Sequence, residues 1–311
     1  MDLTMELRHL RYFTAVAEAL NFTRAAAQLR VAQPALSRQI QDLEVEIGVD
    51  LLRRSPRGVT LTSEGKLFLE ETRELLKRAD ESVAKVRALA RGEYGELHVG
   101  YAPSPSVEVL PPALAAFQKA APRVRVVRHD LASDEMIARL LDGTLHLGIT
   151  VEPSADVSGD ILFEELRRYR FCVALAAGHP FARKKSLKLE EIASQPLVGL
   201  SRRDYTEYYQ LLDRIFAPVK TRPRIAVECD GSTSMLTELE AGNAIGIVSE
   251  LFRRIAGRRL VYRRVSDSIE SHSIGIARTK KGDVTPAGEK FCDILRQVAR
   301  ELRHEKTKPK G

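Results

Sequence analysis

Residues 22–48, FTRAAAQLRVAQPALSRQIQDLEVEIG, place two short apolar-periodic segments almost directly after one another. Thr23 is typical of an N-cap for a first helix that ends near Leu29. Only residues 30–32 separate it from a second helix, and Pro34 suits the start of that helix because proline lacks the N–H that a first turn leaves unpaired. Segments this short cannot bury a core alone, so they must belong to a compact unit with further helices.

The second helix is predicted to have one apolar side and one small polar side. Leu36, Ile40, Leu43 and Ile47 are spaced four, three and four residues apart, which is typical of a stripe that faces a core. The opposite side carries Gln33, Pro34, Ser37, Arg38 and Gln41. Hydroxyl, amide and guanidinium groups can hydrogen-bond to base edges, and a helix N-terminus can bind a phosphate. With an earlier helix over about residues 5–20, the pattern indicates a helix-turn-helix.

Basic residues follow in the segment LLRRSPRGVTLT. Arg53, Arg54 and Arg57 flank a turn that contains proline and glycine, and an alternating strand pattern comes next. We expect a two-stranded wing whose basic tip suits the phosphate backbone or the minor groove. The overall excess of 49 Lys+Arg over 42 Asp+Glu does not locate a nucleic-acid site, whereas this cluster does. The alternative is a small helical bundle whose polar face has no such role.

The segment FTRAAAQLRVAQPALSRQIQDLEVEIGVDLLRRSPRGVTLTSEG is similar to the N-terminal DNA-binding motif of the LysR-type transcriptional regulators. This resemblance implies a winged helix-turn-helix domain over residues 5–63 that binds double-stranded promoter DNA. RNA polymerase would be a further partner if the chain is an activator. The predicted DNA-binding residues are Thr23, Gln33, Pro34, Ser37, Arg38, Gln41, Arg53, Arg54 and Arg57.

A long helix is predicted next, because the chain from Glu64 to Arg91 has one early glycine and no proline. An apolar seam with steps of three and four residues runs along this otherwise charged segment. Its members are Leu69, Thr72, Leu76, Ala79, Val83, Val86 and Ala90. So narrow a seam favours pairing with a second copy, although packing on the helix's own domain is the alternative. The resemblance implies that residues 64–92 form a linker helix that makes a dimer, and that the homo-oligomer is a tetramer.

From Gly92 onward, strand and helix patterns alternate. The run ELHVGY, PPALAAFQKAAP, RVRVVRHD, SDEMIARLLDG and TLHLGIT is typical of βαβαβ and a parallel sheet, and a second such run follows. Two α/β lobes joined by crossings near residues 151–167 and 264–271 would leave a ligand cleft at the strand ends. The resemblance extends here and implies a two-lobed, periplasmic-binding-protein-like (type 2) effector domain. It would cover residues 93–311, with lobe I at about 93–163 and 268–311 and lobe II at about 164–267.

Candidate effector-binding residues stand at strand ends and helix starts. They are Ala102, Ser104, Ser106, Ser133 and Thr150 in the first lobe, and Ser201, Arg202, Ser232 and Thr233 in the second. Hydroxyl and helical N–H groups could hold a carboxylate, so a small-molecule effector is expected, with an organic carboxylate as one candidate. Any one of these residues could equally be an ordinary helix cap. The chain most resembles the branch that controls aromatic-compound catabolism. That branch often has an arginine soon after the third strand, where this chain has GITVEPSAD, which argues against a dicarboxylate.

Catalysis and metal binding have little support in the sequence. No HExxH, Walker, G-x-S-x-G or G-x-G-x-x-G motif occurs, so no catalytic residue, cofactor or metal is predicted. Cys172, Cys229 and Cys292 are widely separated, which fits a reducing compartment and argues against a thiol-pair sensor. Without a leader-like start or a long apolar run, we expect a cytoplasmic protein that binds no membrane. The alternative function is a cytoplasmic α/β small-molecule-binding protein or enzyme with a helical dimerisation domain.

Overall fold

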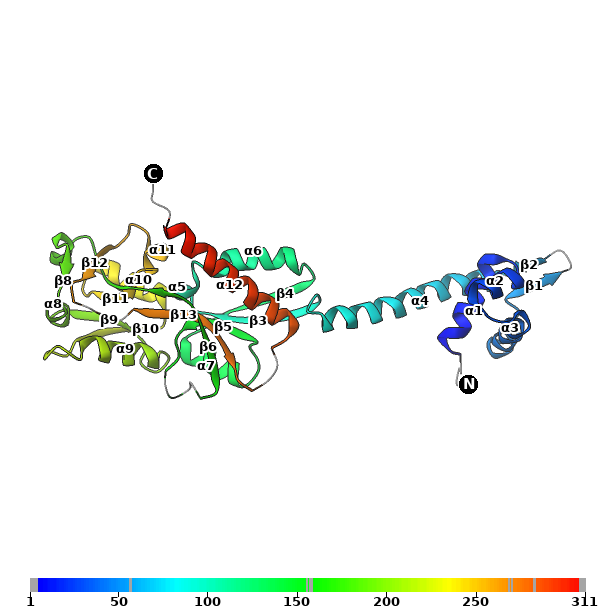
Figure 1. Ribbon diagram of the computed structural model, residues 1–311, viewed down its shortest axis with the longest axis horizontal. Helices are drawn as coiled ribbons and strands as arrows, with labels where there is room; N and C mark the ends of the chain where they lie inside the picture. Colours follow the sequence, from blue (N-terminus) through cyan, green and yellow to red (C-terminus); the bar gives the residue numbers. More distant parts are fainter. Residues whose placement is uncertain are drawn as a thin grey trace. The chain divides into compact units, whose positions relative to one another are not determined.

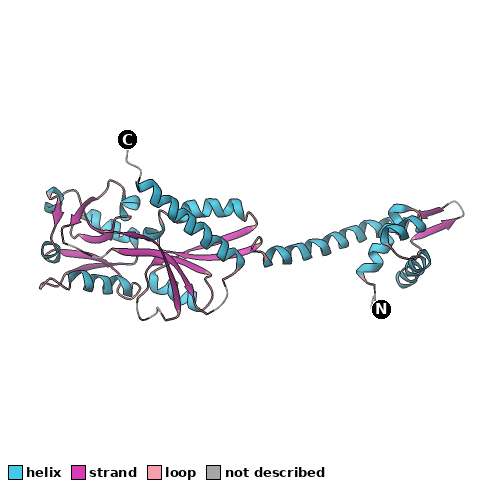
Figure 2. Cartoon of the chain, viewed as in Figure 1, coloured by secondary structure: helices cyan, strands magenta, loops and turns pink. Residues whose placement is uncertain are grey.

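The computed structural model describes residues 5–55, 58–154, 156, 159–267, 269, 271–281 and 284–307. The chain divides into two compact units, Met1–Ala88 and Leu89–Gly311. The first unit is mainly helical, whereas the second alternates strands and helices (Figures 1 and 2). The boundary, between Ala88 and Leu89, lies four residues before Gly92, from which strand and helix patterns were predicted to alternate.

The first unit is built around three short helices and a two-stranded wing (Figure 1). Its elements are α1 (Leu7–Ala19), α2 (Phe22–Leu29), α3 (Gln33–Ile47), β1 (Leu52–Ser55), β2 (Gly58–Leu61) and the start of α4 (Ser63–Ala90). The apolar sides of α1, α2 and α3 meet in one core, in which Phe13, Leu36 and Ile40 are fully buried. The predicted turn over residues 30–32 is confirmed.

The starts of α2 and α3 differ from the prediction by one or two residues. Asn21, not Thr23, caps α2, because its Oδ1 accepts a hydrogen bond from the Arg24 backbone N–H at 2.9 Å. Thr23 lies within the first turn of α2 and is exposed. In α3, Pro34 is the second helical residue, since the helix begins at Gln33 with Ala32 as its N-cap. Proline is tolerated at either position of a first turn.

The predicted long helix is α4, which runs without a break for 28 residues. Leu69 and Thr72, at the start of the predicted seam, are buried in the first unit. Farther along the seam, Val83 is 50% exposed and Val86 is 68% exposed. The beginning of the seam therefore packs on its own domain, whereas its later valines are exposed. Pairing with a second copy stays a prediction for that later part.

Lobe I of the second unit is a five-stranded sheet in the order β4-β3-β5-β13-β6. The strands are β3 (Gly95–Tyr101), β4 (Val124–Asp130), β5 (Leu147–Val151), β6 (Ile161–Tyr169) and β13 (His272–Thr279). The helices are α5 (Pro103–Ser106), α6 (Leu110–Ala120), α7 (Ser133–Leu141) and α12 (Pro286–Thr307). α6 and α12 pack together on one face of the sheet, and α7 packs on the other (Figure 1).

Lobe II has a sheet in the order β11-β7-β12-β8 and a parallel β9–β10 pair that a bridge between Leu197 and Ile245 joins to β11. The strands are β7 (Phe171–Leu175), β8 (Ser186–Leu187), β9 (Pro196–Leu200), β10 (Arg224–Cys229), β11 (Gly246–Ser249) and β12 (Val261–Val265). The helices are η1 (Pro180–Arg183), α8 (Leu189–Ala193), α9 (Thr206–Phe216), α10 (Ser232–Ala241) and α11 (Phe252–Ala256). α8 and α9 belong to one core, and α10 and α11 to another on the opposite face.

The first crossing between the lobes lies later than predicted. β6 pairs antiparallel with β13 along its whole length, so residues 161–169 belong to lobe I, and the chain enters lobe II at Arg170. The sequence ILFEELRRY did not indicate a strand, because its charged residues interrupt the apolar alternation. Such charges are tolerated because β6 is an edge strand of the sheet. The second crossing, residues 266–271, falls within the predicted range.

Candidate functional site

The polar side of α3 is left open after the core is formed. Leu36, Ile40 and Leu43 are at most 1% exposed, whereas Arg38 and Gln41 are exposed. Gln33 and Pro34 at the start of the helix are exposed as well, and Ser37 is half-buried. Arg38 makes no ion pair with any residue that the structure describes. α3 therefore presents amide and guanidinium groups on the side away from its own core, as a major-groove helix must.

The wing arginines have different surroundings. Arg53 is exposed and makes no ion pair within the described part of the chain. The Arg54 guanidinium donates to Ser37 Oγ at 3.1 Å, lies 3.4 Å from Glu44 Oε2 and stacks over the Phe22 ring at 5.0 Å. Arg54 therefore ties the wing to the helix-turn-helix and has part of its charge neutralised. Arg57 lies outside the described residues.

Glu44 fixes the base of the wing against α3. Its Oε1 accepts hydrogen bonds from the backbone N–H groups of Leu51 and Leu52, both at 2.9 Å. One carboxylate thus satisfies two backbone donors and pairs with Arg54, so that α3 and the wing form one rigid surface. Such a surface can contact a groove and the neighbouring backbone together.

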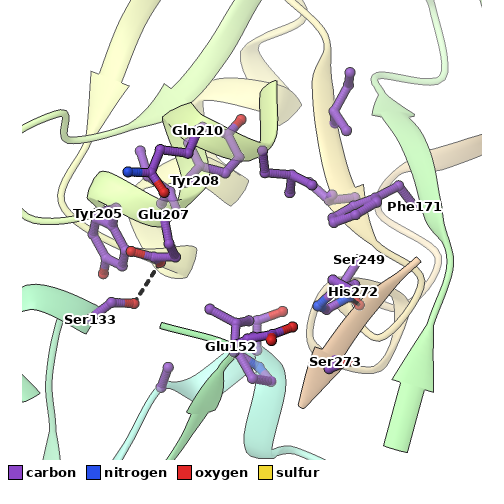
Figure 3. Close-up of a pocket in the computed structure, with 18 of the residues that line it drawn as sticks. Ser133, Glu152, Phe171, Tyr205, Glu207, Tyr208, Gln210, Ser249, His272 and Ser273 are labelled. Atoms are coloured by element: carbon purple, nitrogen blue, oxygen red, sulfur yellow. Dashed lines mark hydrogen bonds between the residues drawn. The ribbon is translucent and has the colours of Figure 1, made fainter. Parts of the chain in front are cut away.

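A cavity of about 540 Å³ lies between the two lobes of the second unit (Figure 3). Four of the predicted effector residues line it, namely Ala102, Ser104, Ser133 and Ser232. The first three come from lobe I, and Ser232 begins α10 in lobe II. The cavity stands at the ends of β3, β5, β9 and β11, where open α/β sheets bind ligands.

The other five predicted residues are not among those that line this cavity. Ser106 is buried and donates to the Ala102 carbonyl at 2.7 Å. Ser201 donates to Asp204 Oδ2 at 2.8 Å, and the Arg202 guanidinium stacks 3.9 Å from the centre of the Tyr209 ring. Thr233 is exposed on α10. The Thr150 hydroxyl is buried, has no partner among the described residues and lines a recess of about 10 Å³ next to Ser133 and Glu207, enough for about one water molecule.

At one end of the cavity the starts of α7 and α9 face each other (Figure 3). Ser133 Oγ of α7 donates to Glu207 Oε1 of α9 at 2.7 Å. In the opposite direction, Asp134 Oδ2 of α7 accepts from Thr206 Oγ1 at 2.7 Å and from the Thr206 backbone N–H at 3.3 Å. Burial raises the pKa of Glu207 to about 7, and the Asp134 charge adds to that rise although the bond from Ser133 opposes it.

His272 lies across the cavity from Glu207 (Figure 3). Its Nε2 is 2.8 Å from Ser249 Oγ, and its ring stacks on Phe171 with the ring centres 4.6 Å apart. Burial lowers the pKa of His272 to about 4, so the imidazole is neutral near pH 7. The apolar walls between these two ends include Phe171, Tyr208, Leu211, Met235, Ile247 and Phe252.

The sequence did not identify Glu207 or His272 as cavity residues. An acidic residue in the first turn of a helix is an ordinary complement to the helix dipole, so TEYYQLLDRIF gave no special reason to select Glu207. His272 begins a strand after the second crossing, and the pairing of β13 with β6 places it opposite Tyr169 and so beside Phe171.

The raised pKa of Glu207 predicts a pH-dependent stability. Between its ordinary value of 4.5 and about 7, the folded chain keeps a proton that the unfolded chain loses, so this group lowers stability as pH rises. We expect Glu207→Gln to melt like wild type near pH 4.5 and to be more stable above pH 7, by about 1–2 kcal/mol after allowance for solvent in the cavity. Melting curves at several pH values test this, with the exposed Glu190→Gln as a control. A difference that does not vary with pH would contradict it.

The thiols and the acidic groups add no further chemistry. Cys172, Cys229 and Cys292 are free and buried, and burial raises the pKa of each thiol, which disfavours the reactive thiolate. Among the described residues, no group of three or more His, Cys, Asp and Glu side chains could hold a metal ion. None of the helices in the described ranges combines the length and the apolar character needed to cross a membrane.

Known proteins resemble this chain over almost all of its length. TcbR, an HTH-type transcriptional regulator from Pseudomonas sp. (strain P51), is 34% identical over 96% of this chain and 100% of its own length. AlsR, an HTH-type transcriptional regulator from Bacillus subtilis (strain 168), is 31% identical over 93% of this chain and 95% of its own. The crystal structure of full-length CbnR complexed with its target DNA superposes with a TM-score of 0.77 at 32% identity, covering 95% of this chain and 100% of CbnR.

Two family models also match. Residues 7–66 match the bacterial regulatory helix-turn-helix protein of the lysR family, and residues 90–300 match the LysR substrate binding domain. These ranges coincide with the helices and wing of the first unit and with the two lobes that enclose the cavity. The chain therefore belongs to the LysR family and is a DNA-binding transcriptional regulator with an effector-binding domain.

Proposed function

We propose that this regulator binds its promoter through the polar side of α3 and the β1–β2 wing, and that a small molecule in the inter-lobe cavity modulates this binding. The observation that carries the proposal is the open side of α3, where Arg38 and Gln41 are exposed on the side opposite the buried Leu36, Ile40 and Leu43. The structure of CbnR with its target DNA supports the same use of this fold.

The proposal gives the arginines different roles. Arg38 is exposed on α3 and can form a bidentate contact with a guanine, which specifies sequence. Arg53 is exposed on the wing and contacts phosphates, which adds affinity without sequence preference. Arg54 holds Ser37 and Glu44 and so positions the wing before DNA arrives.

We expect Arg38→Ala to weaken binding to the promoter upstream of this chain's own gene by about 1–3 kcal/mol, which is about fivefold to 150-fold, and to affect random DNA much less. Arg53→Ala should weaken both DNAs by a similar factor and reduce the salt dependence of binding. Mobility-shift titrations at two salt concentrations measure both effects. Arg123→Ala, which removes one exposed charge from the second unit, is the matched control.

Two results would contradict this assignment. Equal losses on promoter and random DNA for Arg38→Ala would show that Arg38 does not distinguish bases. No retarded band for wild type at low salt would remove the DNA-binding role of this surface altogether.

Oligomer formation is assigned to α4. Val83 and Val86 continue the seam that Leu69 and Thr72 begin, and both are exposed. Three further apolar side chains are exposed on α4 beside the seam, namely Leu67, Leu75 and Leu89. A second copy of α4 would cover these valines in an antiparallel or parallel pair. A homodimer through residues 64–92, and a tetramer of two such dimers, is therefore part of the proposal.

The effector acts through the two lobes. A molecule that touches Ser104 in lobe I and Tyr208 or Met235 in lobe II binds the closed arrangement better than an open one, and that difference can shift the population of states. The protein would work in the cytoplasm, with RNA polymerase as a partner if it activates transcription, and without a cofactor.

The enzymatic alternative has one geometric feature in its favour, the Ser249–His272 pair at 2.8 Å. A serine beside a histidine can serve as nucleophile and base. Here burial lowers the pKa of His272 to about 4, so the imidazole is a weak base at neutral pH. The named relatives are transcriptional regulators, and we propose that this chain is a regulator without enzymatic activity.

A further inference from the structure

Two facing helix starts form one end of the effector cavity, and the chain's own carboxylates already occupy them. The first-turn N–H groups of α7 and α9 would suit a bound anion. Instead, Asp134 of α7 accepts a hydrogen bond from the Thr206 backbone N–H of α9, and Glu207 of α9 accepts one from the Ser133 hydroxyl group. A ligand carboxylate at this end would face two carboxyl groups, and the Thr206 N–H and the Ser133 hydroxyl are already engaged with them.

The remaining charges around the cavity do not make it more favourable for a ligand carboxylate. Glu152 lies at the exposed rim after β5, and Arg214 lies on α9 among the lining residues. His272 at the opposite end is neutral near pH 7 and is engaged with Ser249. The charged side chains of the lining are thus two carboxyl groups, Glu152 and Glu207, and one guanidinium, Arg214. This balance of charge suits a neutral or cationic ligand better than an anionic one.

Between these ends the walls are apolar and partly aromatic. Phe171 and Tyr208 stand on different sides of the cavity in Figure 3, and Met235 and Phe252 extend the apolar lining. A cavity of about 540 Å³ has the size that encloses a small organic molecule. These walls favour a ring, and the polar end favours a group that donates a hydrogen bond.

We propose that the effector is a small ring-bearing molecule that places an amine, amide or hydroxyl donor against Glu207, and that it carries no carboxylate there. This inference rests on the proposed effector role of the cavity and narrows its chemistry. Glu207 would accept the ligand's N–H or O–H, and Ser133 would hold the carboxyl group in place from the other lobe.

A matched series of ligands tests the charge of the head group while keeping the ring constant. Benzylamine, benzyl alcohol, benzamide and benzoate are titrated into the full-length chain at pH 7.5 and followed by calorimetry and thermal shift. We expect the three donor-bearing compounds to bind more tightly than benzoate by about tenfold or more, the typical difference made by a hydrogen bond to a charged group.

Glu207→Gln should reverse the order of affinities of benzylamine and benzoate. The glutamine amide can donate to a carboxylate and no longer attracts an amine, so benzoate should gain about tenfold and benzylamine should lose about tenfold. Glu190→Gln, an exposed change of the same kind on α8, should leave all four affinities unchanged.

The possible failures are distinct. If benzoate binds wild type as well as the donors do, the proposed ligand class is wrong, although the cavity remains an effector site. If no donor-bearing compound binds, the inference is overturned as well, while the mobility-shift test of promoter binding needs no ligand and stands separately. If Glu207→Gln shifts no affinity while the donors still bind, Glu207 is not the group that recognises them, and the inference fails on that point.

Discussion

Replacing Gly65 with alanine is expected to abolish promoter binding. Gly65 lies in the first turn of α4 and packs directly against the backbone of Leu51, just before the wing. A Cβ at this position would lie far inside van der Waals contact of the Leu51 carbonyl oxygen. Because the obstacle is backbone and not a movable side chain, the clash can be relieved only by separating α4 from the wing.

The surrounding hydrogen bonds leave little freedom for such a movement. Thr62 Oγ1 donates to the carbonyl of Asp50 at 2.8 Å and accepts from the Gly65 N–H at 2.8 Å. On its other side the Leu51 peptide donates to Glu44 of α3. We therefore expect a loss of at least about 3 kcal/mol from the stability of the first unit, a large share of what a small domain has.

Thermal melting and mobility-shift titration check this together. The first unit should melt at a lower temperature, and promoter and random DNA should both lose binding, whereas the transition of the second unit should stay in place. Lys66→Ala changes the neighbouring exposed residue and should have little effect. Wild-type DNA binding by Gly65→Ala would show that the contact between α4 and Leu51 can open without consequence.

The helices of the first unit could be predicted because their evidence is local. Leu36, Ile40 and Leu43 repeat at helical spacing, and the structure buries all three. The cap of α2 was harder to predict, because Asn21 and Thr23 are both good N-cap residues and lie two positions apart. The choice depends on where the chain leaves α1, which local propensity does not determine.

The second unit shows the opposite case. The strand β6 was missed because Glu164, Glu165 and Arg168 hide its alternation, although each finds a partner in the folded lobe. Glu164 pairs with Arg296 of α12, Glu165 accepts from Ser273 of β13, and Arg168 pairs with Glu165. The cavity was placed correctly at strand ends. Glu207, however, meets Ser133 only where one lobe docks on the other, and His272 meets Phe171 only through the pairing of β13 with β6. Such contacts join residues far apart in the chain, and no single sequence window contains them.

Glu108 of lobe I makes a contact of this kind that contributes to the stability of the second unit. Its side chain is 4% exposed and lies between α5 and α6. It accepts a hydrogen bond from Tyr169 at 2.6 Å and pairs with Arg254 of α11 in lobe II at 2.8 Å. Arg167 of β6, whose side chain is 7% exposed, lies 3.8 Å away. One buried carboxylate therefore serves two guanidinium groups and ties the lobes together.

Glu108→Ala is expected to destabilise the second unit by about 3–5 kcal/mol, because the Arg167 charge stays buried without its partner. For a unit of this size, that loss lowers the melting temperature by roughly 10 °C. Arg254→Ala should cost less, since the Arg254 side chain is 58% exposed and can return to water. Asp213→Ala breaks an exposed ion pair with Arg222 and serves as the control, with an expected change below about 1 kcal/mol.

A second substitution separates the buried charge from lost packing. Adding Arg167→Met to Glu108→Ala removes the unpaired guanidinium and keeps an apolar stem of similar length, so the double variant should be more stable than Glu108→Ala alone. If Glu108→Ala is too unstable to purify, Glu108→Gln, which keeps an oxygen for Tyr169, gives a smaller loss that Arg167→Met should again reduce. A double variant that is less stable than the single one would show that Arg167 stabilises the lobe through packing and not through its charge.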